Sequence, residues 1–121
     1  MKTAQELVAQ AKANIQKVPV DQADNACNNA DVIIDVREPA EYEAGHLNNA
    51  ICIPRGVLEF KIGDLEQIKD ADTKILIYCK TSGRAALAAQ SLAQLGFNNV
   101  TSITGGYDAW VEAGKPVVAS S

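Results

Sequence analysis

Aromatic side chains are scarce in this chain of 121 residues, which has one Trp, three Tyr and two Phe. Hydrophobic residues still make up 47% of the sequence, so a core has to be built mainly from aliphatic side chains. The formal net charge is −4, and the Lys and Arg residues are scattered instead of clustered beside aromatic residues. The sequence therefore lacks the basic, aromatic surface typical of nucleic-acid-binding domains, and nucleic acid is not an expected partner.

Cysteine and histidine are also few, with three Cys and one His. The cysteines, Cys27, Cys52 and Cys79, are odd in number and far apart, so they indicate neither a disulfide framework nor a CxxC metal site. We expect no metal centre, and free thiols favour a reducing compartment. No long apolar run suggests a signal peptide or a membrane-spanning helix, so the sequence predicts a cytoplasmic protein with no membrane partner.

The most informative stretch comprises residues 74–95, in which a strand pattern changes into a helix pattern. Residues 75–78 form a short apolar run that is typical of a buried strand. Residues 84–95 carry Ala and Leu at helical spacing, and Gly96 follows as a helix stop. Cys79 lies between the two patterns, at the predicted carboxyl end of the strand and before the helix, which is where open α/β sheets bind ligands.

The loop from Cys79 to Arg84 has the residues that a reactive thiolate needs. Lys80 and Arg84 add positive charge, and the unpaired amides at a helix N-terminus also stabilise a thiolate. Gly83 lets the backbone curl, so that successive amides can form an anion-binding cradle. The alternative is a buried structural cysteine, which is the commoner case. The glycine, the two cations and the strand-to-helix position together favour a nucleophile for an oxyanion substrate.

Strand and helix patterns alternate along the rest of the chain, which predicts a parallel α/β sheet. The predicted strands are residues 18–20, 32–36, 51–53, 75–78 and 100–103. The predicted helices are residues 22–27, 38–44, 84–95 and 107–113. A capping box of Thr3 and Glu6 predicts a further helix at the N-terminus, with an apolar face that extends to Val18. Asp21 is expected to cap the helix at 22–27, and residues 56–68 are expected to form a loop with a short helix.

Other candidate residues lie outside the loop. Asp35 and Arg37 follow a predicted strand near the predicted site, where they could tune its charge or form a supporting ion pair, and we favour the ion pair. His46 follows a helix stop and has no obvious partner, so we expect it to brace a loop rather than to act as an acid or base. Cys52 lies between two isoleucines and is expected in the core, whereas Cys27 lies on a polar stretch where it could be exposed.

Three separated sets of residues form recognisable motifs. They are Asp35-Val36-Arg37-Glu38-Pro39 with Glu41-Tyr42, Gly45-His46-Leu47 and Ala50-Ile51-Cys52-Ile53-Pro54, then Tyr78-Cys79 with the loop to Arg84, and then Gly105-Gly106-Tyr107-Asp108-Ala109-Trp110 continuing to Val117. In these motifs the chain resembles the rhodanese family, specifically its single-domain sulfurtransferases, from about residue 32 to residue 117. It departs from common family patterns at Ala85, at Cys52 and at Asn48-Asn49-Ala50, which puts the substrate in question rather than the reaction class.

The resemblance implies a rhodanese-like α/β fold, with a five-stranded, mostly parallel sheet flanked by helices on both faces. Residues 18–121 would form a single rhodanese-like domain. Residues 1–17 would be an N-terminal helical extension packed on that domain.

The resemblance also implies the chemistry. Cys79 stands where the family has its catalytic nucleophile, which takes a sulfane sulfur from a small anionic donor such as thiosulfate and holds it as a persulfide. The residues placed to bind substrate are Lys80, Thr81, Ser82, Gly83 and Arg84, with Asp35 and Arg37 in support. The sulfur would pass to a thiophilic acceptor, which is cyanide in vitro and a small thiol or thioredoxin-like protein in the cell. Neither a cofactor nor a metal is implied.

Two other functions stay open at this point. Cysteine-dependent phosphatases and arsenate reductases also place a thiolate in an anion cradle before a helix, but their usual loop is longer. Here four residues separate Cys79 from Arg84, and Tyr78 stands where tyrosine phosphatases place a histidine. The second alternative is a non-catalytic rhodanese-like interaction module; such modules often lose the cysteine, whereas this chain retains it.

Overall fold

The computed structural model describes residues 1–119, and these residues form a five-stranded sheet. The strands are β1 (Gln16–Val18), β2 (Val32–Asp35), β3 (Ala50–Cys52), β4 (Ile75–Tyr78) and β5 (Val100–Ile103). They lie side by side in the order β1-β5-β4-β2-β3, and each pair of neighbours is parallel. The predicted α/β class is therefore confirmed, and β4, which leads to Cys79, is the central strand.

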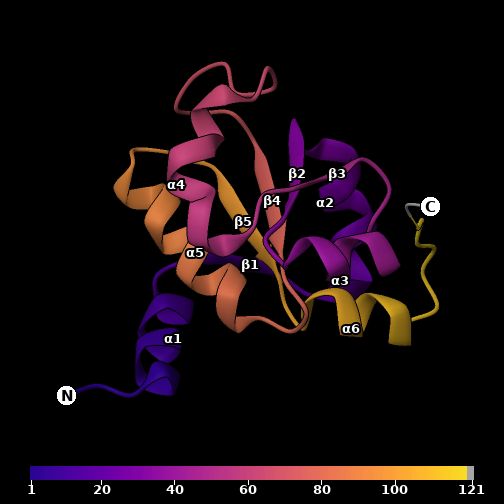
Figure 1. The fold of residues 1–121 in the computed structure, drawn as a ribbon, viewed down its shortest axis with the longest axis horizontal. Helices are drawn as coiled ribbons and strands as arrows, with labels where there is room; N and C mark the ends of the chain where they lie inside the picture. Colours follow the sequence, from indigo (N-terminus) through magenta and orange to yellow (C-terminus); the bar gives the residue numbers. More distant parts are fainter. Residues whose placement is uncertain (120–121) are drawn as a thin grey trace.

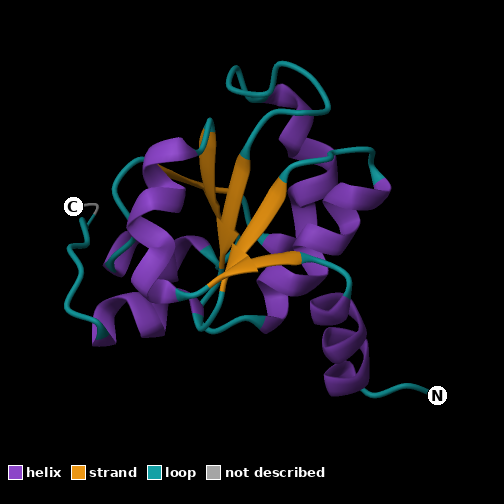
Figure 2. Ribbon diagram, turned by 180° about the vertical axis from the view of Figure 1, so that it is seen from behind, coloured by secondary structure: helices purple, strands orange, loops and turns teal. Residues whose placement is uncertain are grey.

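Helices cover both faces of this sheet, as Figure 2 shows. They are α1 (Ala4–Ala13), α2 (Ala23–Asn29), α3 (Pro39–Ala44), α4 (Leu58–Lys61), α5 (Gly83–Gln94) and α6 (Gly106–Glu112), with short 3-10 turns η1 (Val20–Gln22), η2 (Arg55–Val57) and η3 (Ile62–Asp64). Helices α4 and α5 pack on one face and α2 and α6 on the other, while α1 packs against α5 at the edge (Figure 1). None of the helices within residues 1–119 is long and apolar enough to cross a membrane.

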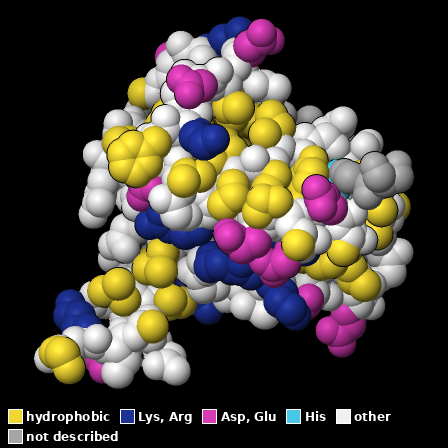
Figure 3. All heavy atoms as spheres, viewed as in Figure 1, with side chains coloured by type: hydrophobic (Ala, Val, Ile, Leu, Met, Phe, Trp, Pro, Cys, Tyr) yellow, Lys and Arg dark blue, Asp and Glu magenta, His cyan; other side chains and the backbone are white. Residues whose placement is uncertain are grey.

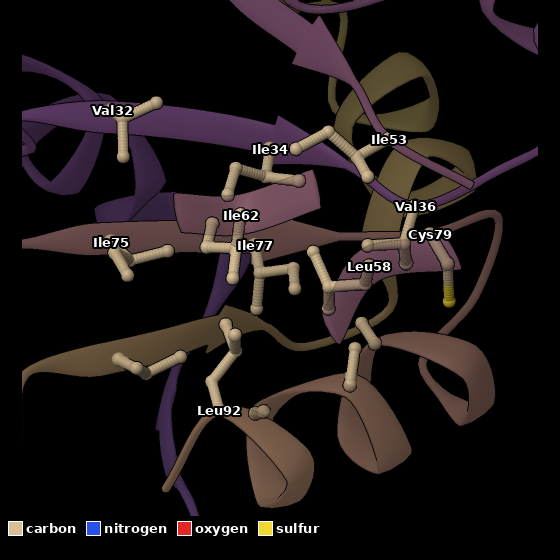
Figure 4. Close-up of a cluster of buried hydrophobic side chains, with 14 residues drawn as sticks. Val32, Ile34, Val36, Ile53, Leu58, Ile62, Ile75, Ile77, Cys79 and Leu92 are labelled. Carbon is tan, nitrogen blue, oxygen red and sulfur yellow. The ribbon is translucent and has the colours of Figure 1, made fainter. Parts of the chain in front are cut away.

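The central strands contribute to two separate cores, because successive side chains of a strand point to opposite faces. Ile34 and Ile77 pack in the cluster on the α4 and α5 side, which also includes Cys79. Ile33 and Leu76 pack in the cluster on the α2 and α6 side. The uninterrupted apolar runs of these strands therefore result from burial on both faces. Figure 4 shows the first cluster as rows of side chains, with Cys79 at one end.

The N-terminal segment differs in part from the prediction. The capping box is confirmed, since the Glu6 amide donates to Thr3 Oγ1 at 3.1 Å, but α1 ends at the C-cap Asn14, so its apolar face does not extend to Val18. Val18 instead belongs to β1, which pairs with β5 two residues earlier than predicted. Pro19 lies outside the strand because it has no amide hydrogen to donate to a ladder.

The predicted cap at Asp21 is wrong. The Gln22 amide donates to the Pro19 carbonyl at 3.0 Å, so Asp21 lies inside the 3-10 turn η1. Helix α2 then begins at Ala23 without a side-chain cap. The turn started by proline, rather than an aspartate cap, therefore leads the chain into this helix.

Candidate active site

Cys79 is the first residue after β4 and is only 1% exposed. Figure 4 shows its side chain close to Val36 and Leu58, in the cluster that α5 covers. The residue before it, Tyr78, anchors the end of the strand, because its hydroxyl accepts a hydrogen bond from the Leu47 amide at 3.1 Å. The thiol therefore lies at the base of its loop, against an apolar wall.

The backbone of the loop leaves its amide groups available. The amides of Tyr107 and Asp108, at the start of α6, donate to the carbonyl oxygens of Cys79 at 2.8 Å and Lys80 at 3.0 Å. Within the described part of the chain, no group accepts a hydrogen bond from the backbone amides of residues 80–84. Consecutive free amides at a helix N-terminus form an anion-binding site, so the loop has the donors that a bound oxyanion or persulfide requires.

Gly106 permits the close approach of α6 to this loop. It has a φ of 58°, and a Cβ atom at this position would clash with the carbonyl oxygens of Cys79 and Thr81. Because an L side chain would be strained there and would also push the loop away, glycine is required. The sequence indicated a family motif at Gly105-Gly106, but it did not reveal this contact.

The two loop cations are each paired with a carboxylate. Lys80 Nζ donates to Asp108 Oδ2 at 2.7 Å on the surface, while Arg84 binds Glu41 through two hydrogen bonds of 2.8 and 3.0 Å. The hydrogen bonds to Glu41 are the main reason that the pKa of Arg84 is raised above its ordinary value, and the neighbouring Cys79 acts in the same direction. Figure 3 shows basic and acidic side chains side by side across the middle of one face. An anionic donor therefore has to compete with Glu41 for Arg84.

The Glu41–Arg84 pair should stabilise the protein only above the acidic range. The hydrogen bonds from Arg84 hold the pKa of Glu41 at about 2, below its ordinary value of 4.5. The folded state keeps this carboxylate ionised. The contribution of the pair to the free energy of unfolding is therefore complete above pH 4.5 and is lost as the pH falls towards 2. We expect Glu41→Gln to lower the free energy of unfolding by about 0.5 kcal/mol near neutral pH, with a smaller difference in acid.

Urea denaturation near neutral pH and at about pH 3, between the folded and ordinary pKa values of Glu41, would measure this difference. Glu43→Gln, on the same helix α3, is the matched control, because Glu43 makes no ion pair within residues 1–119. An effect of Glu41→Gln that is equal at both pH values would contradict the assignment.

Asp35 and Arg37 form a buried ion pair at the carboxyl end of β2. Arg37 Nη2 lies 2.7 Å from Asp35 Oδ2 and also donates to the Gly45 carbonyl at 2.6 Å. The guanidinium stacks over the ring of Tyr107, with its central carbon 4.1 Å from the ring centroid. The pair thus links β2 to the end of α3 and to α6, and these two helices contact the Cys79 loop through Glu41 and through the amides of Tyr107 and Asp108.

The remaining candidate residues lie apart from the loop. His46 stacks on Tyr42 with ring centroids 3.7 Å apart, and its Nδ1 lies 2.7 Å from the Tyr42 carbonyl oxygen, as expected for a bracing histidine. Cys52 is only partly buried and lies outside the two cores, contrary to the prediction, and its thiol donates to the Arg37 carbonyl at 3.6 Å. Cys27 is half-buried against the second core instead of exposed, and this burial raises its pKa to about 11. Burial also raises the pKa of Cys52, so neither thiol is activated.

A parallel α/β domain with a cysteine in an amide-lined loop defines a class of proteins that hold a thiolate, or a group bound to it, at a helix N-terminus. The chain belongs to one family of this class, the rhodanese-like domain family, whose sequence model matches residues 19–113. Its relatives include proteins named as sulfurtransferases at about 30% identity.

Three similar proteins illustrate this relationship. A protein of Allochromatium vinosum named sulfurtransferase is 30% identical over 88 residues, which cover 73% of this chain and 78% of that protein. Thiosulfate sulfurtransferase 16, chloroplastic, of Arabidopsis thaliana is 35% identical over 94 residues, which cover 71% of this chain and 78% of that protein. A solved structure from Rhodopseudomonas palustris, described as a protein of unknown function and possible tyrosine phosphatase, has a TM-score of 0.83 and 30% identity, covering 98% of this chain and 96% of that one.

Proposed function

We propose that this protein is a sulfurtransferase that carries a sulfane sulfur as a persulfide on Cys79. The observation that carries the proposal is the set of backbone amides at residues 80–84 that have no acceptor among residues 1–119, together with the buried thiol of Cys79. The names of relatives support a sulfur donor and a sulfur acceptor in general. We assign a small anion such as thiosulfate as donor, and cyanide, a small thiol or a thioredoxin-like protein as acceptor. Free cysteines fit a reducing compartment such as the cytoplasm.

Sulfur loading follows from the polarity of the loop. The Cys79 thiolate attacks the outer sulfur of thiosulfate, the S–S bond of the donor breaks, and sulfite leaves with the electron pair. Arg84 binds the anionic end of the donor in exchange for Glu41, and the amides of residues 80–84 then hold the terminal sulfur of the persulfide. Fixed amide dipoles replace the water that would solvate this anion, and no reorganisation is needed during the reaction.

Sulfur discharge completes the cycle. A nucleophilic acceptor attacks the outer sulfur of the persulfide, a new bond to the acceptor forms, and the Cys79 thiolate leaves with the electron pair. Because the donor product departs before the acceptor reacts, the kinetics should be ping-pong.

Thiocyanate production from thiosulfate and cyanide tests the proposal. We expect Cys79→Ser to remove the activity, because an alcohol is neither ionised nor nucleophilic at neutral pH. Cys52→Ser is the matched control and should retain activity within about threefold, since its thiol has a raised pKa and lies outside the loop. Activity that survives in Cys79→Ser would contradict the proposal.

Arg84→Ala should slow sulfur loading from thiosulfate by roughly 10- to 100-fold, the range expected when a charged hydrogen-bond partner is lost. Discharge of the preformed persulfide to cyanide should change much less, since the amides still hold the sulfur. Rapid mixing with each substrate separately measures the two half-reactions. The control is Arg55→Ala, which removes an arginine that is paired with Glu59 on α4. Equal slowing of both half-reactions would contradict a role of Arg84 in binding the donor.

A phosphatase is the competing assignment, because the Rhodopseudomonas palustris structure is described as a possible tyrosine phosphatase. Four residues separate Cys79 from Arg84, which makes a smaller cradle that suits a single sulfur better than a tetrahedral phosphoryl group. Hydrolysis of an aryl phosphate by the wild type, lost in Cys79→Ser and without any thiocyanate formation, would favour the phosphatase.

A further inference from the structure

A cavity of about 240 Å³ lies behind the Cys79 loop, between the N-terminal segment and the sheet. Lys12, Ile15 and Lys17 line it from the segment that runs from α1 into β1. Ser82 and Ala86 line it from the start of α5, and Ser102 lines it from β5. Figure 1 shows α1 beside the beginning of α5, where these segments meet. Cys79 itself is not among the lining residues.

Two serine hydroxyls in the cavity wall are available to a ligand. Ser102 is only 3% exposed and lines the cavity. Ser82 occupies the N-cap of α5 but makes no side-chain cap hydrogen bond, although capping is the usual role of serine at this position. A serine hydroxyl can donate and accept a hydrogen bond, so Ser82 and Ser102 can each bind a polar group of a ligand.

The charge around this cavity is positive in a chain whose net charge is −4. Lys17 Nζ donates to the backbone carbonyl of Lys12 at 2.7 Å, which fixes the position of the Lys17 ammonium group. No acidic side chain of the described residues lines the cavity. Ile15 and Ala86 supply apolar wall. Two lysines, an apolar wall and three residues with hydroxyl groups, Ser82, Ser102 and Thr104, are complementary to an anion with a small apolar body.

We propose that this cavity is a binding site for a small organic carboxylate, which adjoins the persulfide loop at Ser82 but does not include Cys79. Its volume equals that of about eight water molecules at roughly 30 Å³ each, which is enough for one ring or a short chain. The carboxylate would bind the two lysines and the serine hydroxyls, and the apolar body would lie against Ile15. Lys12, Ile15 and Lys17 precede residue 19, where the match to the family begins, so the family assignment does not account for this site.

Titration of the isotope-labelled protein with benzoate, followed by amide NMR, tests the site without any sulfur-transfer assay. We expect saturable shifts at the amides of Ser82, Ala86 and Ser102. Benzamide has the same shape without the charge and should bind at least tenfold more weakly. The double variant Lys12→Gln/Lys17→Gln should lose affinity for benzoate by at least tenfold, whereas Lys61→Gln/Lys69→Gln, on other surfaces, should not.

Ser102→Val gives an independent test, because it fills part of the cavity and removes a hydroxyl. This variant should also lose benzoate binding while its spectrum elsewhere stays that of the folded wild type. The proposal is overturned if benzoate does not bind, if benzamide binds equally well, or if the lysine or Ser102 variants leave the benzoate affinity unchanged. None of these results bears on the persulfide, so the two proposals succeed or fail separately.

Discussion

Asp35→Ala should lower the free energy of unfolding by about 3–5 kcal/mol, because it leaves the guanidinium of Arg37 buried without a counter-ion. The two side chains are 0% and 4% exposed, so water does not replace the lost partner. Asp35 Oδ1 accepts hydrogen bonds from the Arg37 amide at 2.9 Å and from Nε at 3.0 Å, and Oδ2 accepts from Nη2 at 2.7 Å. Urea denaturation followed by Trp110 fluorescence measures the loss.

The surface pair of Lys80 and Asp108 is the control. Its side chains are 58% and 45% exposed, so Asp108→Ala should cost less than about 1 kcal/mol. The double variant Asp35→Leu/Arg37→Leu should regain much of the stability, because it removes both buried charges. A loss in Asp35→Ala that is no larger than that in Asp108→Ala would contradict the structural role of the buried pair.

Gly106→Ala should lower kcat/KM for sulfur transfer by about 100-fold, the cost expected when reacting groups are displaced by about 1 Å. The added Cβ would clash with the carbonyl oxygens of Cys79 and Thr81, so α6 and the loop have to separate. The loop amides would then no longer be held in position around the sulfur. Steady-state thiocyanate formation measures the effect.

Gly114→Ala is the control that distinguishes the effect of the clash at residue 106 from the effect of backbone strain. Gly114 also has a positive φ, of 76°, but a Cβ there would meet nothing within 4 Å. Both variants should lose about 1–2 kcal/mol of stability from the left-handed backbone, and only Gly106→Ala should lose the activity. If both variants retain wild-type kcat/KM, contact with α6 does not position the loop.

The sheet could be predicted where strands are buried on both faces. Residues 32–34 and 75–78 are apolar throughout because each side chain enters one of the two cores. The edge strand β1 carries two exposed residues, Gln16 and Lys17, and its position depends on pairing with β5 rather than on its own pattern. Its bounds were therefore predicted incorrectly.

The loop of the candidate site could be found because strand, cysteine, glycine and helix are consecutive in the sequence. The partners of its cations could not be found this way. Glu41 is 43 residues from Arg84, and Asp108 is 28 residues from Lys80. Only the tertiary packing of α3 and α6 around the end of β4 brings these carboxylates to the loop. The sequence alone therefore predicts more unpaired positive charge in the loop than the structure has.

The central claim is that Cys79 carries the sulfur, and intact-mass measurement after thiosulfate treatment tests it most directly. The wild type should gain the mass of one sulfur atom, peptide mapping should place it on Cys79, and cyanide should remove it. Cys79→Ser should gain nothing, while Cys52→Ser and Cys27→Ser should behave like the wild type. A cyanide-labile sulfur on Cys27 or Cys52, or one that persists in Cys79→Ser, would contradict the account.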